Sequence, residues 1–146
     1  MIPLYVMVIA IAAARALGWL GWAALDDWAE ATRGGLAVMF VFTAASHFTR
    51  TRQDLIRIVP PQLPNPALLV TLTGVAEAVG AVGLVTPGWS RVAGAGLILL
   101  LLAMFPANIR AAQAKLTIAG RPAPPLPFRA ALQVFWIGLI GWSALH

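Results

Sequence analysis

The chain has 146 residues, of which 60% are hydrophobic and only 10% are charged. A typical soluble domain is about 45–50% apolar and about 25% charged, so this sequence has too few polar residues to cover a water-facing surface. The net charge of +5 does not indicate a nucleic-acid-binding protein, because the basic residues are spread singly between apolar segments. The absence of cysteine excludes thiolate catalysis, disulfide exchange, Fe–S ligation and cysteine-type zinc sites. An integral membrane protein remains.

Five long apolar runs follow one another along the chain. A bilayer core of about 30 Å needs roughly 20 apolar residues of helix. The runs lack the alternation of strands, and unpaired backbone groups are not tolerated in lipid, so each run is expected to be a helix. The sequence therefore predicts one all-α domain over residues 1–146, a polytopic transmembrane bundle of five helices. The expected helices cover residues 4–25, 31–48, 67–86, 91–107 and 129–145.

The connections between the runs carry local signals. The residues from Thr51 to Asp54 form a capping-box pattern before an apolar pair, which predicts a short interfacial helix. The proline-rich segment 60–66 cannot remain helical. Pro106 is expected to kink the fourth helix, which should continue as an interfacial helix to residue 119 with Gly120 as its C-cap.

The distribution of lysine and arginine predicts the orientation of the chain, because cytoplasmic loops are enriched in both. A cytoplasmic N-terminus and an external C-terminus place seven basic residues inside and two outside. Those inside are Arg50, Arg52, Arg57, Arg110, Lys115, Arg121 and Arg129, and those outside are Arg33 and Arg91. The tryptophans at positions 22, 28, 89 and 142 then fall near the outer interface. We therefore expect this orientation in the cell membrane.

Arg15 and Glu77 are the two charges inside otherwise apolar runs. An unpaired charge at the centre of a bilayer costs about 2.5–3.5 kcal/mol on insertion scales. The predicted first and third helices run parallel, which places the two side chains at similar depth and favours a buried ion pair. That pair either only fixes helix packing or tunes Glu77 as a proton or ligand group. A third alternative leaves Arg15 reaching the membrane surface alone.

His47 and Asn108 are the other candidate site residues. His47 ends the second run on the inner side, where it is either an interfacial histidine bonded to a loop carbonyl or an acid/base or ligand group. Asn108 follows Pro106 and either satisfies free backbone or joins His47. We expect both to line an inward-opening cleft under the 60–66 loop, with Glu77 as its floor. No metal site is expected, because His47, Glu77 and the distant His146 do not make a ligand set.

Four short motifs occur in an order that resembles the DoxX-like family of integral membrane proteins. They are His47-Phe48, Ile58-Val59-Pro60-Pro61 with Leu63-Pro64, Thr73-Gly74-Val75-Ala76-Glu77 and Phe105-Pro106-Ala107-Asn108. The resemblance covers about residues 34–145 and implies a core of about four transmembrane helices, to which this chain adds an N-terminal helix. It also implies a ligand-binding site at His47, Glu77 and Asn108. The family includes subunits linked to thiosulfate:quinone oxidoreduction, accessory proteins of redox maturation and receptor-assembly chaperones.

These observations leave three functions open. The first is a redox-associated membrane subunit that binds a quinone, or another small lipophilic ligand, between its helices. The second is a non-catalytic assembly factor that holds a partner helix, and the third is a small transporter, which at this length would need to oligomerise. The expected partners are the lipid bilayer and either another membrane protein or a second copy of the chain, with no nucleic acid. Whether the protein is an enzyme stays open.

Overall fold

The computed structural model describes residues 2–145, which form a bundle of helices. Four of these helices are long and apolar enough to cross a membrane, namely α1 (Ile2–Trp19), α4 (Pro66–Val85), α5 (Ser90–Gln113) and α6 (Leu126–Leu145). A fifth long helix, α2 (Trp28–Ser46), carries Glu30 and Arg33 and is less apolar. The smaller elements are the 3-10 helix η1 (Ala23–Leu25), helix α3 (Arg52–Ile58) and a hairpin of strands β1 (Thr117–Ile118) and β2 (Arg121–Pro122).

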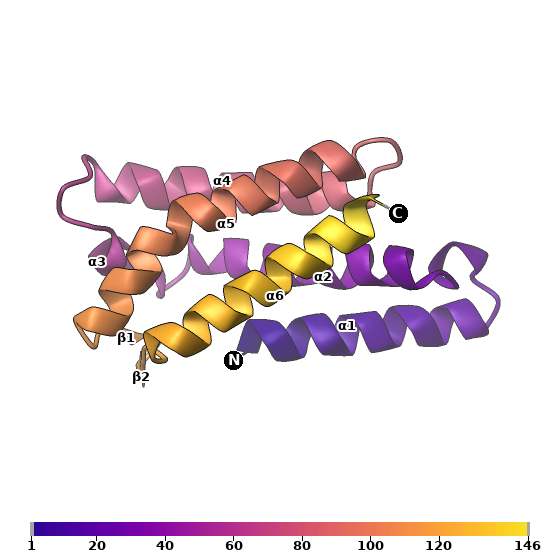
Figure 1. Cartoon of the computed structure of the whole chain (residues 1–146), viewed down its shortest axis with the longest axis horizontal. Coiled ribbons are helices and arrows are strands. Elements are labelled where there is room, and N and C mark those ends of the chain that lie inside the picture. Colours follow the sequence, from indigo (N-terminus) through magenta and orange to yellow (C-terminus); the bar gives the residue numbers. More distant parts are fainter. Residues whose placement is uncertain (1, 146) are drawn as a thin grey trace.

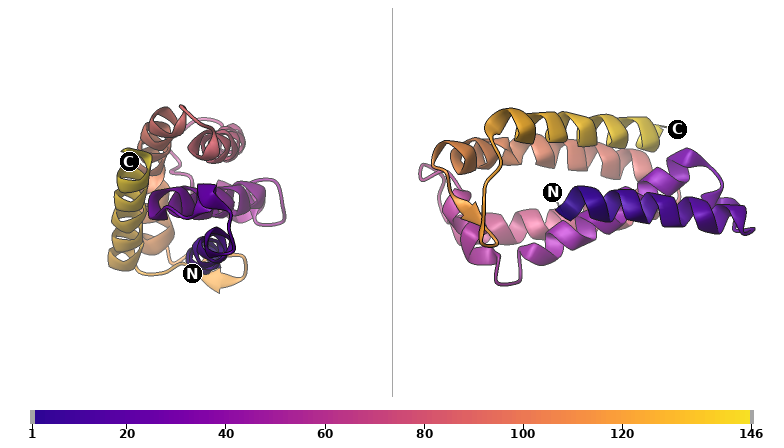
Figure 2. Two further views of the ribbon diagram at one scale, coloured as in Figure 1. Left: turned by 90° about the vertical axis from the view of Figure 1, so that its right-hand side faces the viewer. Right: turned by 90° about the horizontal axis from the view of Figure 1, so that it is seen from below.

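Helix α2 lies in the middle of the bundle (Figures 1 and 2). It packs against α1, α4 and α6, while α5 packs against α4 and α6. Leu36, Met39 and Phe40 of α2 are almost fully buried, and they form one apolar core with residues such as Met7 of α1 and Ile140 of α6. Because the neighbouring helices surround it, α2 can carry polar residues that a lipid-facing helix could not.

The first helix ends six residues earlier than the sequence predicts. Helix α1 stops at Trp19, and Gly21 takes a φ of 106°, which is the left-handed region that glycine adopts without strain. The chain then folds back through η1 into α2, whose first turn is capped by Asp27. The Asp27 carboxylate accepts hydrogen bonds from the backbone N–H groups of Ala29 and Glu30.

The fourth helix also ends early, so the expected interfacial helix to residue 119 is wrong. Helix α5 contains Pro106, bends along its length (Figure 1) and stops at Gln113. Lys115 adopts a φ of 49°, and the Leu116 N–H donates to the Ala111 carbonyl, which closes the helix in a Schellman motif. The following residues form the β1–β2 hairpin, with Gly120 in its turn rather than at a helix C-cap.

The short helix after the second run is present as α3, but its capping box is not. Thr51 precedes α3 without any side-chain hydrogen bond to it among the described residues. Asp54 instead accepts a hydrogen bond from the backbone N–H of Ala119 at 2.8 Å and pairs with Arg57. The Ala119 hydrogen bond and the Arg57 guanidinium lower the pKa of the Asp54 carboxyl. Asp54 therefore ties the hairpin to α3.

Candidate functional site

The expected ion pair between Arg15 and Glu77 is not formed. Its guanidinium donates to the Leu25 carbonyl at 3.0 Å and to the Asp26 carboxylate at 3.2 Å. The same guanidinium lies 4.7 Å from the centre of the Trp28 ring, within the range of a cation–π contact. The charge of Arg15 is thus compensated at the end of the bundle where η1 lies.

Two features of the fold explain why Arg15 pairs with Asp26 and not with Glu77. Helix α1 ends at Trp19, so Arg15 lies one turn from the helix end rather than at mid-membrane, and the returning chain brings Asp26 to it. Gly18 permits that return, because a Cβ on Gly18 would lie 2.6 Å from the Leu25 carbonyl oxygen. Helix α2 also packs on both α1 and α4 and so lies between them.

Glu77 meets His47 instead, on the interface between α4 and the end of α2. The His47 Nε2 and the Glu77 Oε2 are 3.7 Å apart, and the two side chains are only 4% and 6% exposed. Gly74 allows this approach, since a Cβ at Gly74 would lie 2.6 Å from the Cβ of His47. The structure therefore brings together two of the three expected site residues.

The contacts of the His47 ring fix which nitrogen carries a hydrogen. Its Nδ1 lies 2.7 Å from the Val70 carbonyl oxygen, which can only accept, so Nδ1 must donate. In the neutral ring Nε2 then presents a lone pair toward Glu77. No atom of the described residues hydrogen-bonds Oε2 of Glu77, and the Thr43 side chain lies beside the carboxyl group. A lone pair facing an acceptor oxygen is a place for one proton.

Asn108 lies apart from this pair, in a polar cluster between α5 and α6. Its amide nitrogen is 3.3 Å from Oε1 of Gln133, and its amide oxygen accepts a hydrogen bond from Arg129. Within the described chain, the buried Nε of Arg129 and the buried Nε1 of Trp136 have no hydrogen-bond partner. The cluster therefore offers two unused N–H donors.

This cluster lines a cavity of about 590 Å³. The cavity is bounded by the start of α1, by α2, α3, α5 and α6, and by the hairpin with the segment that follows it. Much of the lining is apolar and includes Leu4, Phe42, Leu101 and Leu132. Its polar groups are Thr43, Ser46, Thr51, Asn108, Arg121, Arg129, Gln133 and the indole of Trp136. An apolar cavity with a few convergent polar groups is typical of a small-molecule site.

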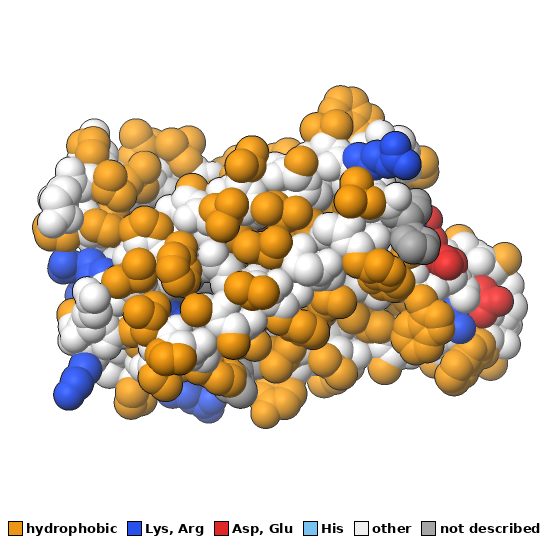
Figure 3. All heavy atoms as spheres, in the orientation of Figure 1, with side chains coloured by type: hydrophobic (Ala, Val, Ile, Leu, Met, Phe, Trp, Pro, Cys, Tyr) orange, Lys and Arg blue, Asp and Glu red, His pale blue; other side chains and the backbone are white. Residues whose placement is uncertain are grey.

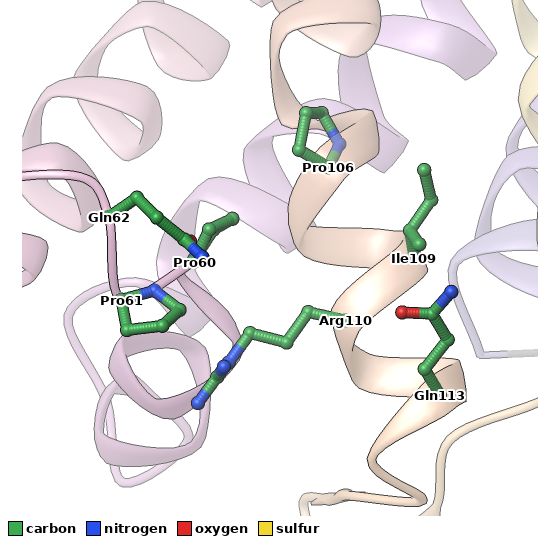
Figure 4. A pocket seen from close by; sticks show the side chains of 7 residues that line it. All are labelled: Pro60, Pro61, Gln62, Pro106, Ile109, Arg110 and Gln113. Carbon is green, nitrogen blue, oxygen red and sulfur yellow. The ribbon is translucent and has the colours of Figure 1, made fainter.

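The expected cleft under the 60–66 loop is therefore corrected in two respects. His47 does not line the cavity that contains Asn108, and the hairpin covers that cavity in place of the loop. The loop borders a smaller pocket of about 240 Å³ on α5 (Figure 4). There Arg110 extends from α5 toward the loop, and its Nε donates to the Arg57 carbonyl at 3.1 Å. This contact holds the last turn of α3, from which the loop continues, against α5.

Thr43 connects the cavity to the buried pair. Its side chain lines the cavity, and its hydroxyl contacts the Glu77 carboxyl, so one side chain of α2 reaches both. Thr43, Gln133 and Trp136 are not among the site residues expected from the sequence, and Arg129 enters there only as a charge that sets orientation. A signal for Thr43 and Gln133 was present, because both are polar residues within apolar runs.

A double-mutant cycle distinguishes the observed partner of Glu77 from the expected one. We predict a coupling of about 0.5–3 kcal/mol in the free energy of unfolding between Glu77→Gln and His47→Gln, because the side chains are in contact. Glu77→Gln and Arg15→Met should add to within about 0.5 kcal/mol. Unfolding of the detergent-solubilised variants by a denaturing detergent provides the measurement. Equal couplings in the two cycles would contradict the assignment.

A family model described as a domain of unknown function, DUF8561, matches residues 36–144. No curated protein and no solved structure matches the chain. The matched region begins within α2 and contains His47, Glu77, Asn108 and the cavity-lining part of α6. The chain belongs to the DUF8561 family.

Proposed function

We propose that the protein is a membrane protein that binds a small lipophilic ligand with acceptor oxygens, of the quinone class, in the cavity beside Asn108. The observation that carries this proposal is the set of unused donors in an apolar surrounding. The buried N–H groups of Arg129 and Trp136 have no partner within residues 2–145. A buried unpaired donor costs about 1–3 kcal/mol. A bound carbonyl oxygen would remove that cost.

The shape and position of the cavity agree with such a ligand. Its volume of about 590 Å³ lies within the range of about 300–1,000 Å³ that is usual for small-molecule sites. Its polar groups from α5 and α6 would hold a polar head, and Leu4, Leu101 and Leu132 would contact an apolar tail. The resemblance to DoxX-like proteins supports a quinone as the ligand class, with redox chemistry supplied by a partner protein.

We also propose that α2 crosses the membrane, which gives five spans with a cytoplasmic N-terminus and an external C-terminus. The helices α1, α4 and α6 pack around α2, and its exposed residues in the central turns, such as Val38 and Val41, are apolar, so its polar residues do not prevent a crossing. Figure 3 supports the orientation, since basic side chains gather at the end with α3 and the hairpin. Acidic side chains are visible only toward the opposite end in that view. The cell membrane is the proposed location.

Quinone binding is tested first on the purified protein. We expect quinone to co-purify after mild solubilisation and to be detected by mass spectrometry. A short-chain benzoquinone should bind the Arg129→Met variant roughly 10- to 100-fold more weakly, because a hydrogen bond to a charged donor is worth about 1.5–3 kcal/mol. Arg110→Met is the matched control, since Arg110 lines the smaller pocket and not the cavity. Equal dissociation constants for the two variants would reject the proposal.

Single cysteines test the orientation, because the chain has none of its own. A membrane-impermeant maleimide added to intact cells should label Pro87→Cys, in the turn between α4 and α5, and should leave Gln62→Cys unlabelled. Both positions are exposed. Permeabilised cells should show labelling of both variants, which controls for reactivity. Labelling of Gln62→Cys alone in intact cells would invert the proposed orientation.

A further inference from the structure

Arg129 of α6 is a cation that lacks a carboxylate partner among the described residues. Its guanidinium carries several N–H donors, and it makes a side-chain hydrogen bond only to the neutral amide oxygen of Asn108 within residues 2–145. Its Nε is buried and bonds no atom of those residues. The ion pairs of the described chain do not include it. Because charged residues in membrane helices are almost always paired, Arg129 is missing its counter-charge.

The acidic residues of the chain lie elsewhere. The sequence has five of them, and none lines the cavity to which Arg129 belongs. Three lie around η1 and the start of α2, and Figure 3 shows acidic side chains only toward that end of the bundle. The other two contact Arg57 and His47. The five acidic residues are Asp26, Asp27, Glu30, Asp54 and Glu77.

The position of Arg129 within α6 does not compensate its charge either. Helix α6 begins at Leu126, so Arg129 lies in the first turn, which contains no acidic residue. The helix dipole favours an anion at this end and a cation at the other. A second basic side chain, that of Arg121 in the hairpin, lines the same cavity. The cavity therefore has two arginines and the start of a helix in or beside its lining, with no carboxylate in that lining.

The hydrogen bonds beside Arg129 leave donors for a ligand. Arg129 can only donate, so it contacts the amide oxygen of Asn108, and the amide nitrogen of Asn108 then faces Gln133. Gln133 accepts through its oxygen, which leaves its own amide N–H groups as donors. The indole N–H of Trp136 has no partner among the described residues. Donors beside a positive charge are the arrangement that binds an anionic oxygen.

We propose that the cavity beside Asn108 selects a ligand whose polar head is an anion, with Arg129 as its counter-charge. Within the quinone class this ligand is a hydroxyquinone. Its ring hydroxyl is acidic because it is conjugated with a ring carbonyl, and it is ionised at neutral pH. The inference rests on the ligand site proposed above and adds the charge of the ligand to it. A fatty acid also carries an anionic oxygen on an apolar body, so both ligand types are measured.

A pair of ligands of nearly the same shape and different charge tests this selection. The probes are a short-chain alkyl hydroxynaphthoquinone and the methyl ether of its ring hydroxyl, and they are added to the purified protein in an uncharged detergent at neutral pH. We expect the hydroxyquinone to bind roughly ten-fold or more tightly than the ether. The reason is that a charge pair with Arg129 in an apolar cavity is stronger than a hydrogen bond to a neutral oxygen.

Variants that change the charge beside the ligand provide the second readout. Asn108→Asp places a carboxylate of almost the same size beside Arg129 and should abolish the preference for the hydroxyquinone over the ether. It should also raise the unfolding temperature of the ligand-free protein, because Arg129 gains its counter-charge. Gln113→Glu is the matched control, since it makes the same change on α5 at a residue that lines the smaller pocket and not the cavity.

Two substitutions of Arg129 separate its charge from its shape. Arg129→Lys retains the positive charge and should retain the preference for the hydroxyquinone, whereas Arg129→Gln should lose it. Because the ratio of the two dissociation constants is compared between variants, unequal partition of the probes into detergent does not affect the result. A ratio unchanged in Asn108→Asp, or an unfolding temperature that does not rise in it, would overturn the assignment of Arg129 as an uncompensated cation.

The outcomes distinguish this inference from the proposed function. Equal binding of the hydroxyquinone and its ether, both weakened by Arg129→Met, would overturn the anion preference and leave the quinone site standing. Binding of dodecanoate but not of dodecanol, with no binding of either quinone, would reject the quinone function and support the anionic head. Failure of all these probes to bind would reject both proposals.

Discussion

The constraint on which the rest of the structure depends is the central position of α2. This helix carries Glu30, Arg33, Thr43 and, at its end, His47. Exposing these polar and charged side chains to lipid would be energetically costly. Packing α1, α4 and α6 around it gives Thr43 and His47 protein neighbours, while Glu30 and Arg33 pair with each other at its start. Glycines allow these helices to approach one another closely. A Cβ on Gly35 would lie 2.2 Å from a side-chain carbon of Ile11, and Gly74 meets His47 in the same way.

Polar residues inside such a bundle need partners, and Arg15 and Glu77 each have a neighbouring side chain to pair with. Arg15 is compensated by Asp26 and two indole rings near η1, while Glu77 contacts His47 near the opposite end of α2. Five buried side-chain atoms of the described residues have no hydrogen-bond partner: Nε of Arg15, Arg33 and Arg129, Nε1 of Trp136 and Oε2 of Glu77. Those of Arg129 and Trp136 belong to residues that line the cavity.

Composition and periodicity were sufficient to predict the helical elements from the sequence. It predicted an all-helical bundle, the approximate bounds of the long helices and the short helix before Pro60, because apolar runs and prolines set these directly. It failed where a backbone turn decided the outcome. The positive φ angles of Gly21 and Lys115 end α1 and α5 early, which moves Arg15 to Asp26 and replaces a helical segment with a hairpin. Depth counted along a straight helix could not reveal that α2 lies between Arg15 and Glu77.

The central claim is that a quinone binds in the cavity beside Asn108, and photolabelling tests it most directly. A benzoquinone carrying an azide is illuminated on the solubilised protein, and the modified residues are identified by mass spectrometry. We expect adducts on the cavity-lining parts of α2 and α6, around Phe42 and Leu132, that unlabelled quinone suppresses. Adducts on lipid-facing residues such as Val79 and Val82, which are 66% and 63% exposed, that persist under competition would contradict the account.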